Sequence, residues 1–166
     1  MKKVEQQKYR IINKRNNIIV YSLAVVLVAS GIAYILVANS EYSDYKDLAS
    51  VGVKSGEVVE KQFEISFFII AASIYFGLCV WVLKSKEKRR KAPFIASIAV
   101  SAFLIVAYIA SRTVGVPIVG VEYYVGRLDI LAKVLQAIVI GLSCVTIYNL
   151  KEQKTSENRF NYEKST

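Results

Sequence analysis

The sequence predicts an all-α integral membrane protein, a bundle of four transmembrane helices with both termini in the cytoplasm. Four long apolar segments follow one another in a 166-residue chain that is 54% hydrophobic, at residues 18–38, 62–84, 92–112 and 128–150. Each is about as long as the roughly 20 residues of helix that cross a bilayer. The connecting segments alternate between strongly basic and not, which is the charge pattern that orients helices across a membrane.

The apolar segments exclude a soluble domain. Residues 18–38, 65–83 and 92–111 contain no Asp, Glu, Lys or Arg. A helix that is apolar all round is buried or faces lipid, whereas a soluble helix carries polar residues on its outward face. So short a chain has little with which to bury four such helices, so we expect lipid around them. The net charge of +9 then marks membrane topology and does not indicate a nucleic-acid partner.

The orientation follows from the basic residues. Residues 1–17 and the loop after the second span are rich in Lys and Arg, whereas the loop at 39–61 is acidic. Basic residues in short loops stay in the cytoplasm. We therefore expect a cytoplasmic basic tail at 1–17, a transmembrane domain at 18–150 and a cytoplasmic polar tail at 151–166, in the cell membrane. The basic runs could also bind anionic lipid.

The first span is expected to be a retained anchor, because its apolar run exceeds the 7–15 residues typical of a signal-peptide core. Small residues such as Gly31 suit it to close helix contact. The loop at 39–61 holds Gly52 and Gly56, so we expect it to be mostly irregular. A short helix lying on the membrane surface there is the alternative.

The later spans each have one distinctive face. The second carries Ser66, Ser73 and Gly77 on roughly one face. Pro93 lies in the first turn of the third span, where its missing N–H does no harm. That span has one polar stripe, which we expect to face other helices: Ser97, Ser101, Tyr108 and Arg112.

Residues 113–127 contain several glycines and a proline, typical of a turn-rich outer connection. The polar tail after Leu150 is expected to be frayed or bound to a partner.

The candidate site is a group of charged residues at the outer end of the predicted bundle. Charges near the hydrocarbon are costly unless paired or hydrated, and they commonly mark function. The group is Glu64, Arg112, Glu122, Arg127, Asp129 and Lys133, with Gln136 continuing the Lys133 face inward. Its three acids and three bases sum to zero.

Pairing within this group has three expected features. Asp129 and Lys133 are i, i+4 on one helix face with the acid first, the favourable order. Asp129 also lies near the positive end of its helix. Arg112 can hold a carboxylate in bidentate geometry, for which Glu122 and Asp129 are the first candidates and Glu64 the third.

The group has two interpretations. One is an outward-facing polar pocket or a docking surface for a partner subunit. The other is a neutral ion-pair clasp that ties the outer loop over the bundle, with Lys133 snorkelling to the surface.

Missing residue types exclude several chemistries. The sequence contains no histidine, so haem ligation, histidine-based copper or zinc sites and histidine general-base catalysis are closed to this chain alone. Neither a phosphate-binding glycine loop nor a nucleophile elbow is present. Cys79 and Cys144 are not in a CxxC motif, and we expect both to be inert core residues. We expect no catalytic residue, no metal ligand and no cofactor.

The run Ser111–Pro117, continuing through Gly120, Glu122, Asp129 and Lys133, resembles a signature of small four-helix membrane proteins of archaea and bacteria. The Lys- and Tyr-rich composition is also similar to membrane proteins of ammonia-oxidising archaea. Small helical proteins of that kind resemble accessory subunits of the archaeal ammonia monooxygenase. The resemblance implies a supporting role, with copper ligands supplied by other subunits, and it carries no catalytic residue onto this chain.

The leading functional hypothesis is a non-catalytic membrane subunit that packs against other integral membrane subunits through its small-residue and polar helix faces. The alternative is a small homo-oligomeric transporter or channel with Asp129, Lys133 and Gln136 lining a path. A membrane enzyme is the third and least supported class. Membrane lipid is an expected partner, and nucleic acid is not.

Overall fold

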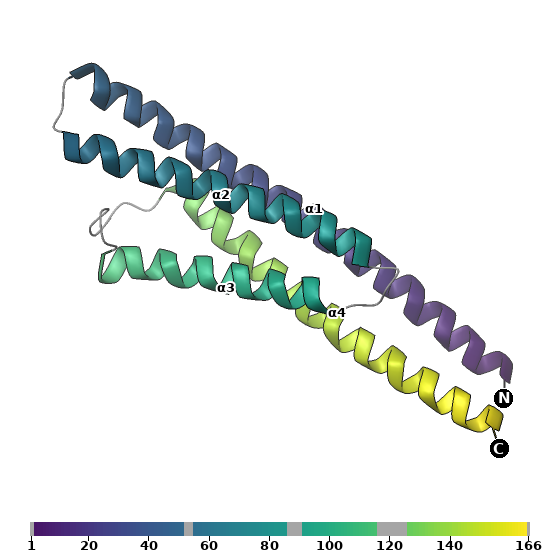
Figure 1. The fold of residues 1–166 in the computed structure, drawn as a ribbon. Coiled ribbons are helices and arrows are strands. Elements are labelled where there is room, and N and C mark those ends of the chain that lie inside the picture. Colours follow the sequence, from purple (N-terminus) through teal and green to yellow (C-terminus); the bar gives the residue numbers. More distant parts are fainter. Residues whose placement is uncertain (1, 52–54, 86–90, 116–125, 166) are drawn as a thin grey trace.

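The computed structural model describes residues 2–51, 55–85, 91–115 and 126–165, and it confirms the all-α, four-helix prediction (Figure 1). The helices are α1 (Lys2–Val51), α2 (Ser55–Ser85), α3 (Ala92–Thr113) and α4 (Arg127–Ser165). The basic residues at 86–90, Glu122 and most of the turn-rich connection lie outside the described residues.

Each of the four helices is long and apolar enough to cross a membrane. The bundle itself cannot bury this apolar surface: only 22% of the most apolar window of α3 is buried inside the structure. Large side chains such as Ile70, Phe103 and Val106 are more than half exposed. The apolar surface therefore suits a surrounding of lipid, as in a multi-pass membrane protein.

The helices form a ring in which neighbours are antiparallel. α1 packs against α2 and α4, and α3 packs against α4 and α2. Both termini lie at one end of the bundle, here called the terminal end, which holds Arg15 and Glu152 (Figure 1). The opposite end, here called the hairpin end, holds Ser50, Arg112 and Asp129.

The interior is apolar with a polar seam. Fully buried apolar side chains include Leu23 and Leu27 of α1, Val82 of α2 and Val139 of α4. Polar side chains of α3 and α4 that are also wholly buried are Ser97, Ser101, Gln136 and Ser143. The prediction that the polar stripe of α3 faces other helices is confirmed for its two serines.

The ends of α3 follow from two residues of its sequence. Pro93 occupies the first turn, as predicted. At the other end, the N–H groups of Val114 and Gly115 both donate to the carbonyl of Ala110, at 3.0 Å each. Gly115 has a φ of 80°, a left-handed conformation that glycine adopts without a Cβ clash and that terminates helices.

The expectation of an irregular segment at 39–61 is wrong for the described part of it. α1 continues to Val51, and α2 begins at Ser55. At 50 residues, α1 is about 75 Å long, well beyond the roughly 30 Å of the bilayer core. In this acidic segment α1 and α2 stabilise each other, since Nζ of Lys61 on α2 lies 2.6 Å from Oε2 of Glu41 on α1.

Two further expectations concern α4 and the cysteines. The segment after Leu150, expected to be frayed or bound to a partner, is helical rather than frayed and continues α4 to Ser165. Cys79 is buried as expected, but Cys144 is exposed on the outside of the bundle. The reason is rotational: Cys144 follows Ser143, which faces the interior, and adjacent helical positions lie about 100° apart.

Candidate functional site

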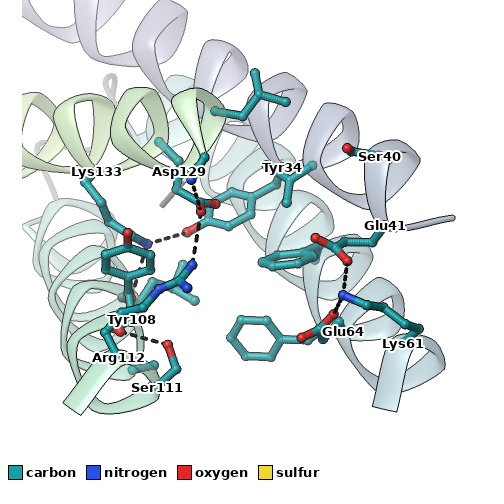
Figure 2. Close-up of a pocket in the computed structure, with 18 of the residues that line it drawn as sticks. Tyr34, Ser40, Glu41, Lys61, Glu64, Tyr108, Ser111, Arg112, Asp129 and Lys133 are labelled. Carbon is teal, nitrogen blue, oxygen red and sulfur yellow. Dashed lines mark hydrogen bonds and ion pairs between the residues drawn. The ribbon is translucent and has the colours of Figure 1, made fainter. Parts of the chain in front are cut away.

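A pocket of about 800 Å³ lies at the hairpin end, with lining residues from all four helices. This volume is within the range typical of small-molecule sites, about 300–1,000 Å³. Figure 2 shows its charged residues in two groups, one on α1 and α2 and the other on α3 and α4.

The α3–α4 group is built around Asp129. Its Oδ2 lies 3.2 Å from Nη2 of Arg112 and accepts a hydrogen bond from the Gly126 N–H at 3.1 Å. Asp129 is in the first turn of α4, where the helix dipole favours a negative charge. The structure thus pairs Arg112 with one of its two first candidates, while the other, Glu122, lies outside the described residues. The pair joins the end of α3 to the start of α4.

Lys133 does not extend to the surface. Its Nζ lies 3.4 Å from the carbonyl oxygen of Leu104 and 3.5 Å from the hydroxyl of Tyr34. The ammonium also lies 4.6 Å from the centre of the Tyr108 ring, a cation–π distance. These contacts belong to α1 and α3, so snorkelling along the outside of α4 is not what the structure shows. Asp129, the expected i, i+4 partner, has its Oδ2 engaged by Arg112 and Gly126 instead.

Gln136 continues this face into the bundle and is fully buried. Its Nε2 donates to the Tyr34 hydroxyl at 2.5 Å, while its Oε1 has no hydrogen-bond partner within the described part of the chain. Beside it, the hydroxyls of Tyr75 and Ser101 lie 3.0 Å apart. The Tyr34 and Tyr75 rings stack at 5.8 Å. A polar chain therefore runs from the pocket to the middle of the bundle.

The α1–α2 group is an ion-pair triad. Lys61 Nζ lies 2.6 Å from Glu41 and 2.8 Å from Glu64. Glu64 is only 7% exposed, and the shared ammonium offsets the cost of burying its carboxylate. Glu64 was the third candidate partner of Arg112, and Lys61 is a cation that it contacts in the structure.

Several residues that line the pocket were not among the sequence candidates. Glu41 and Lys61 were assigned to a loop, and Tyr34 to an ordinary apolar span. Their signals were present but weak. Lys61 and Glu64 have the i, i+3 spacing of helical neighbours. Tyr34 lies one turn after Ser30 and Gly31 on the face that packs inside the bundle.

The charges of the described residues that line the pocket sum to zero, and its two walls carry charges of opposite sign. Among the described lining residues, the α1–α2 wall carries a net two negative charges and the α3–α4 wall a net two positive charges. Arg127, the remaining described candidate, is exposed and lines the rim of the positive wall. The residues involved are Glu41, Asp44, Lys61 and Glu64 on the first wall and Arg112, Arg127, Asp129 and Lys133 on the second.

This arrangement can hold charged or polar groups by ion pairing and hydrogen bonding. No set of three or more His, Cys, Asp or Glu residues that could hold a metal ion occurs within the described residues. Tyr34 and Glu64 are the most buried of the described polar residues that line the pocket.

Comparison with known proteins adds no family to this description: no family model, curated protein or solved structure matches the chain.

Proposed function

We propose that this chain is a non-catalytic integral membrane subunit that packs against other integral membrane subunits. The observation that supports the proposal most directly is the environment of its helical glycines. Among the described residues, Gly56 and Gly77 of α2 and Gly141 of α4 have open space where a Cβ would be, and Gly77 and Gly141 fall within the candidate membrane spans.

Gly31 provides the contrast. A Cβ built at Gly31 would lie 2.9 Å from Cζ of Phe76, so this glycine is required by packing within the chain. A Cβ at Gly77 or Gly141 would meet nothing within 4 Å. Glycine in a helix interior costs about 1 kcal/mol relative to alanine. Packing within the chain gives no reason for glycine at these two positions, and a closely approaching partner helix would give one.

Gly77 and Gly141 each belong to a row of small residues. On α2 the row is Ser66, Ser73 and Gly77, whose two hydroxyls donate to carbonyls of their own helix. On α4, Ala137 precedes Gly141 by one turn and is also exposed. In lipid, helix association depends on close packing, and small residues let the backbones approach. Two such rows on different helices suit a chain that contacts neighbours on more than one side.

The proposal uses the small-residue faces and not the polar ones. The polar stripes of the third and fourth spans are also candidates for partner contact by their sequence. Four polar side chains of these stripes are wholly buried inside the bundle and cannot contact a neighbouring subunit: Ser97, Ser101, Gln136 and Ser143.

Native mass measurement after gentle extraction tests the proposal. The unaltered chain should be found with other membrane chains. Gly77→Leu or Gly141→Leu should remove at least one co-purifying chain while leaving the melting temperature of this chain unchanged, because only the outer face gains bulk. Ala102→Leu, which adds bulk to an exposed position of α3, is the matched control and should keep the assembly.

Gly31→Leu is the opposite control. It should lower the stability of the chain itself, by roughly 1–3 kcal/mol, because the added side chain overpacks against Phe76. A lone monomer that neither glycine substitution affects would contradict the proposal. Copper-binding subunits among the co-purifying chains would support the ammonia monooxygenase-type complex that the sequence resemblance implies.

A second candidate is a small homo-oligomeric transporter or channel. The buried polar seam favours it, because Lys133, Gln136, Ser101 and Ser97 continue inward from the pocket. The fully buried Val139, one turn beyond Gln136, interrupts the polar side chains along α4. This candidate requires ion-coupled flux in liposomes that Lys133→Ala abolishes, together with a native mass that is a multiple of this chain alone.

A further inference from the structure

The opposite charges of the two pocket walls point to the kind of molecule that the pocket accepts. Figure 2 shows the Glu41–Lys61–Glu64 triad on one side and Arg112, Asp129 and Lys133 on the other. A lone anion would suit one wall and be repelled by the other, and so would a lone cation. A molecule that carries both charges is complementary to both walls and leaves the site neutral.

The positive wall presents Lys133 to such a molecule. Its hydrogen-bond and ring contacts are neutral groups: a hydroxyl, a backbone carbonyl and the faces of two tyrosine rings. The charges of Asp129 and Arg112 act on it at longer range, and among the described residues no carboxylate lies within salt-bridge distance of its Nζ. A cation held by dipoles and rings at the side of a pocket attracts an anionic group, with which it can form a direct ion pair.

The negative wall has the reverse excess. Glu41 and Glu64 share the one ammonium of Lys61. Asp44, one turn beyond Glu41 on α1, also lines the pocket and is exposed. An ammonium placed beside Glu41 and Asp44 would balance this wall in the way that Lys61 balances the triad.

Apolar and aromatic side chains line the rest of the pocket. Phe63, Phe67 and Phe68 come from α2, and Val37 and Leu104 from the helices beside it. These side chains can receive hydrocarbon, and their rings suit an alkylated ammonium. The lining therefore accepts an amphiphilic molecule more readily than a simple salt.

We propose that the hairpin-end pocket binds a zwitterionic group, with its anion against Lys133 and its ammonium against Glu41 and Asp44. Two sources share this chemistry: the head group of a zwitterionic phospholipid from the surrounding leaflet, and a soluble zwitterion of the phosphoethanolamine kind. The proposal does not depend on the subunit function, because Gly77 and Gly141 lie outside the bundle and do not line the pocket.

The test measures binding to the full-length chain in detergent micelles. In the lipid arm, native mass spectrometry compares the retention of phosphatidylethanolamine with that of phosphatidylglycerol, which has the phosphate but no ammonium. In the soluble arm, thermal shift compares phosphoethanolamine with inorganic phosphate and with ethanolamine. We expect the zwitterion to be preferred in at least one arm, and the arm that responds identifies the source.

Single variants test the contact with the anionic group and the contact with the ammonium separately. Lys133→Gln and Glu41→Gln should each weaken zwitterion binding by about tenfold or more, since each removes one charge pair. Glu41→Gln should also erase the preference for phosphatidylethanolamine over phosphatidylglycerol. Lys46→Gln and Asp47→Asn, which change exposed charges on α1 that do not line the pocket, are the matched controls and should leave binding unchanged.

Lys133→Arg is the control for a loss of binding that is caused by misfolding. It keeps the positive charge and should retain binding where Lys133→Gln does not. Equal retention of both lipids together with no selectivity in the soluble arm would overturn the proposal. So would binding that survives both Lys133→Gln and Glu41→Gln.

Discussion

At the scale of single residues, Tyr34 connects the pocket to the interior of the bundle. Its hydroxyl accepts hydrogen bonds from Gln136 and Lys133, and its ring stacks on Phe68 at 6.0 Å and on Tyr75 at 5.8 Å. Buried polar groups are costly without partners. One tyrosine on α1 therefore accepts a hydrogen bond from each of two polar side chains of α4.

We predict that Tyr34→Phe destabilises the chain by about 1 kcal/mol. The ring and its stacking remain, but Gln136 and Lys133 lose an acceptor in a place that water reaches poorly. Thermal unfolding in detergent measures the change. Tyr148→Phe, at a tyrosine that is 69% exposed, is the control and should have no effect. Equal stability of the two variants would contradict the assigned hydrogen bonds.

At the scale of elements, α1 and α2 form a helical hairpin that continues past the pocket. The last pocket-lining residue of α1 is Asp44, and the helix runs on for about 10 Å to Val51. Tyr42 stacks on Tyr45 at 6.2 Å, and Lys46 lies 4.8 Å from the centre of the Tyr42 ring. Contacts at i, i+3 and i, i+4 of this kind support a helix in a segment whose composition resembles a loop.

We predict that Ser43→Pro destabilises the chain, which would show that this segment is helical and not an irregular loop. Proline within a helix removes a hydrogen bond and clashes with the carbonyl four residues earlier, here Asn39, at a cost of about 3 kcal/mol. In an irregular loop the same substitution would be tolerated. Helical content and the unfolding midpoint measure the difference. Ser43→Ala should match the unaltered chain, and a stable Ser43→Pro variant would refute a continuous α1.

At the scale of the whole molecule, we expect the two ends of the bundle to lie on opposite sides of a membrane. At the terminal end, Arg15 of α1 donates to Asn149 of α4 at 3.2 Å and lies 3.9 Å from Glu152. At the hairpin end, the Glu41–Lys61–Glu64 triad joins α1 to α2. From the positive-inside pattern of the sequence we expect the terminal end in the cytoplasm.

We predict that a membrane-impermeant maleimide distinguishes the two ends. In a background with Cys79→Ala and Cys144→Ala, Ser50→Cys should react in intact cells. Thr155→Cys should react only after the membrane is opened. Labelling of both positions from the same side would rule out an odd number of crossings between them, and the reverse pattern would invert the orientation.

Much of the architecture is local in origin and was therefore predictable. Hydropathy accumulates along a segment regardless of its neighbours, so four spans could be located from composition alone. A carboxylate partner for Arg112 was also expected, with Glu122 and Asp129 as the first candidates, and Asp129 is one that it contacts. Pro93 and Gly115 mark helix ends through their own backbone preferences.

The sequence by itself determined the number of helices, their apolar character and the end at which charges gather. Only the tertiary structure decided how each helix is rotated about its axis and which helices meet. That rotation turned Lys133 toward Tyr34, turned Cys144 outward and brought Glu64 into contact with Lys61. The physical reason is that rotation depends on the simultaneous packing of four helices. A positional shift of one residue turns a side chain by about 100°, and hydropathy within a single segment carries no information about that choice.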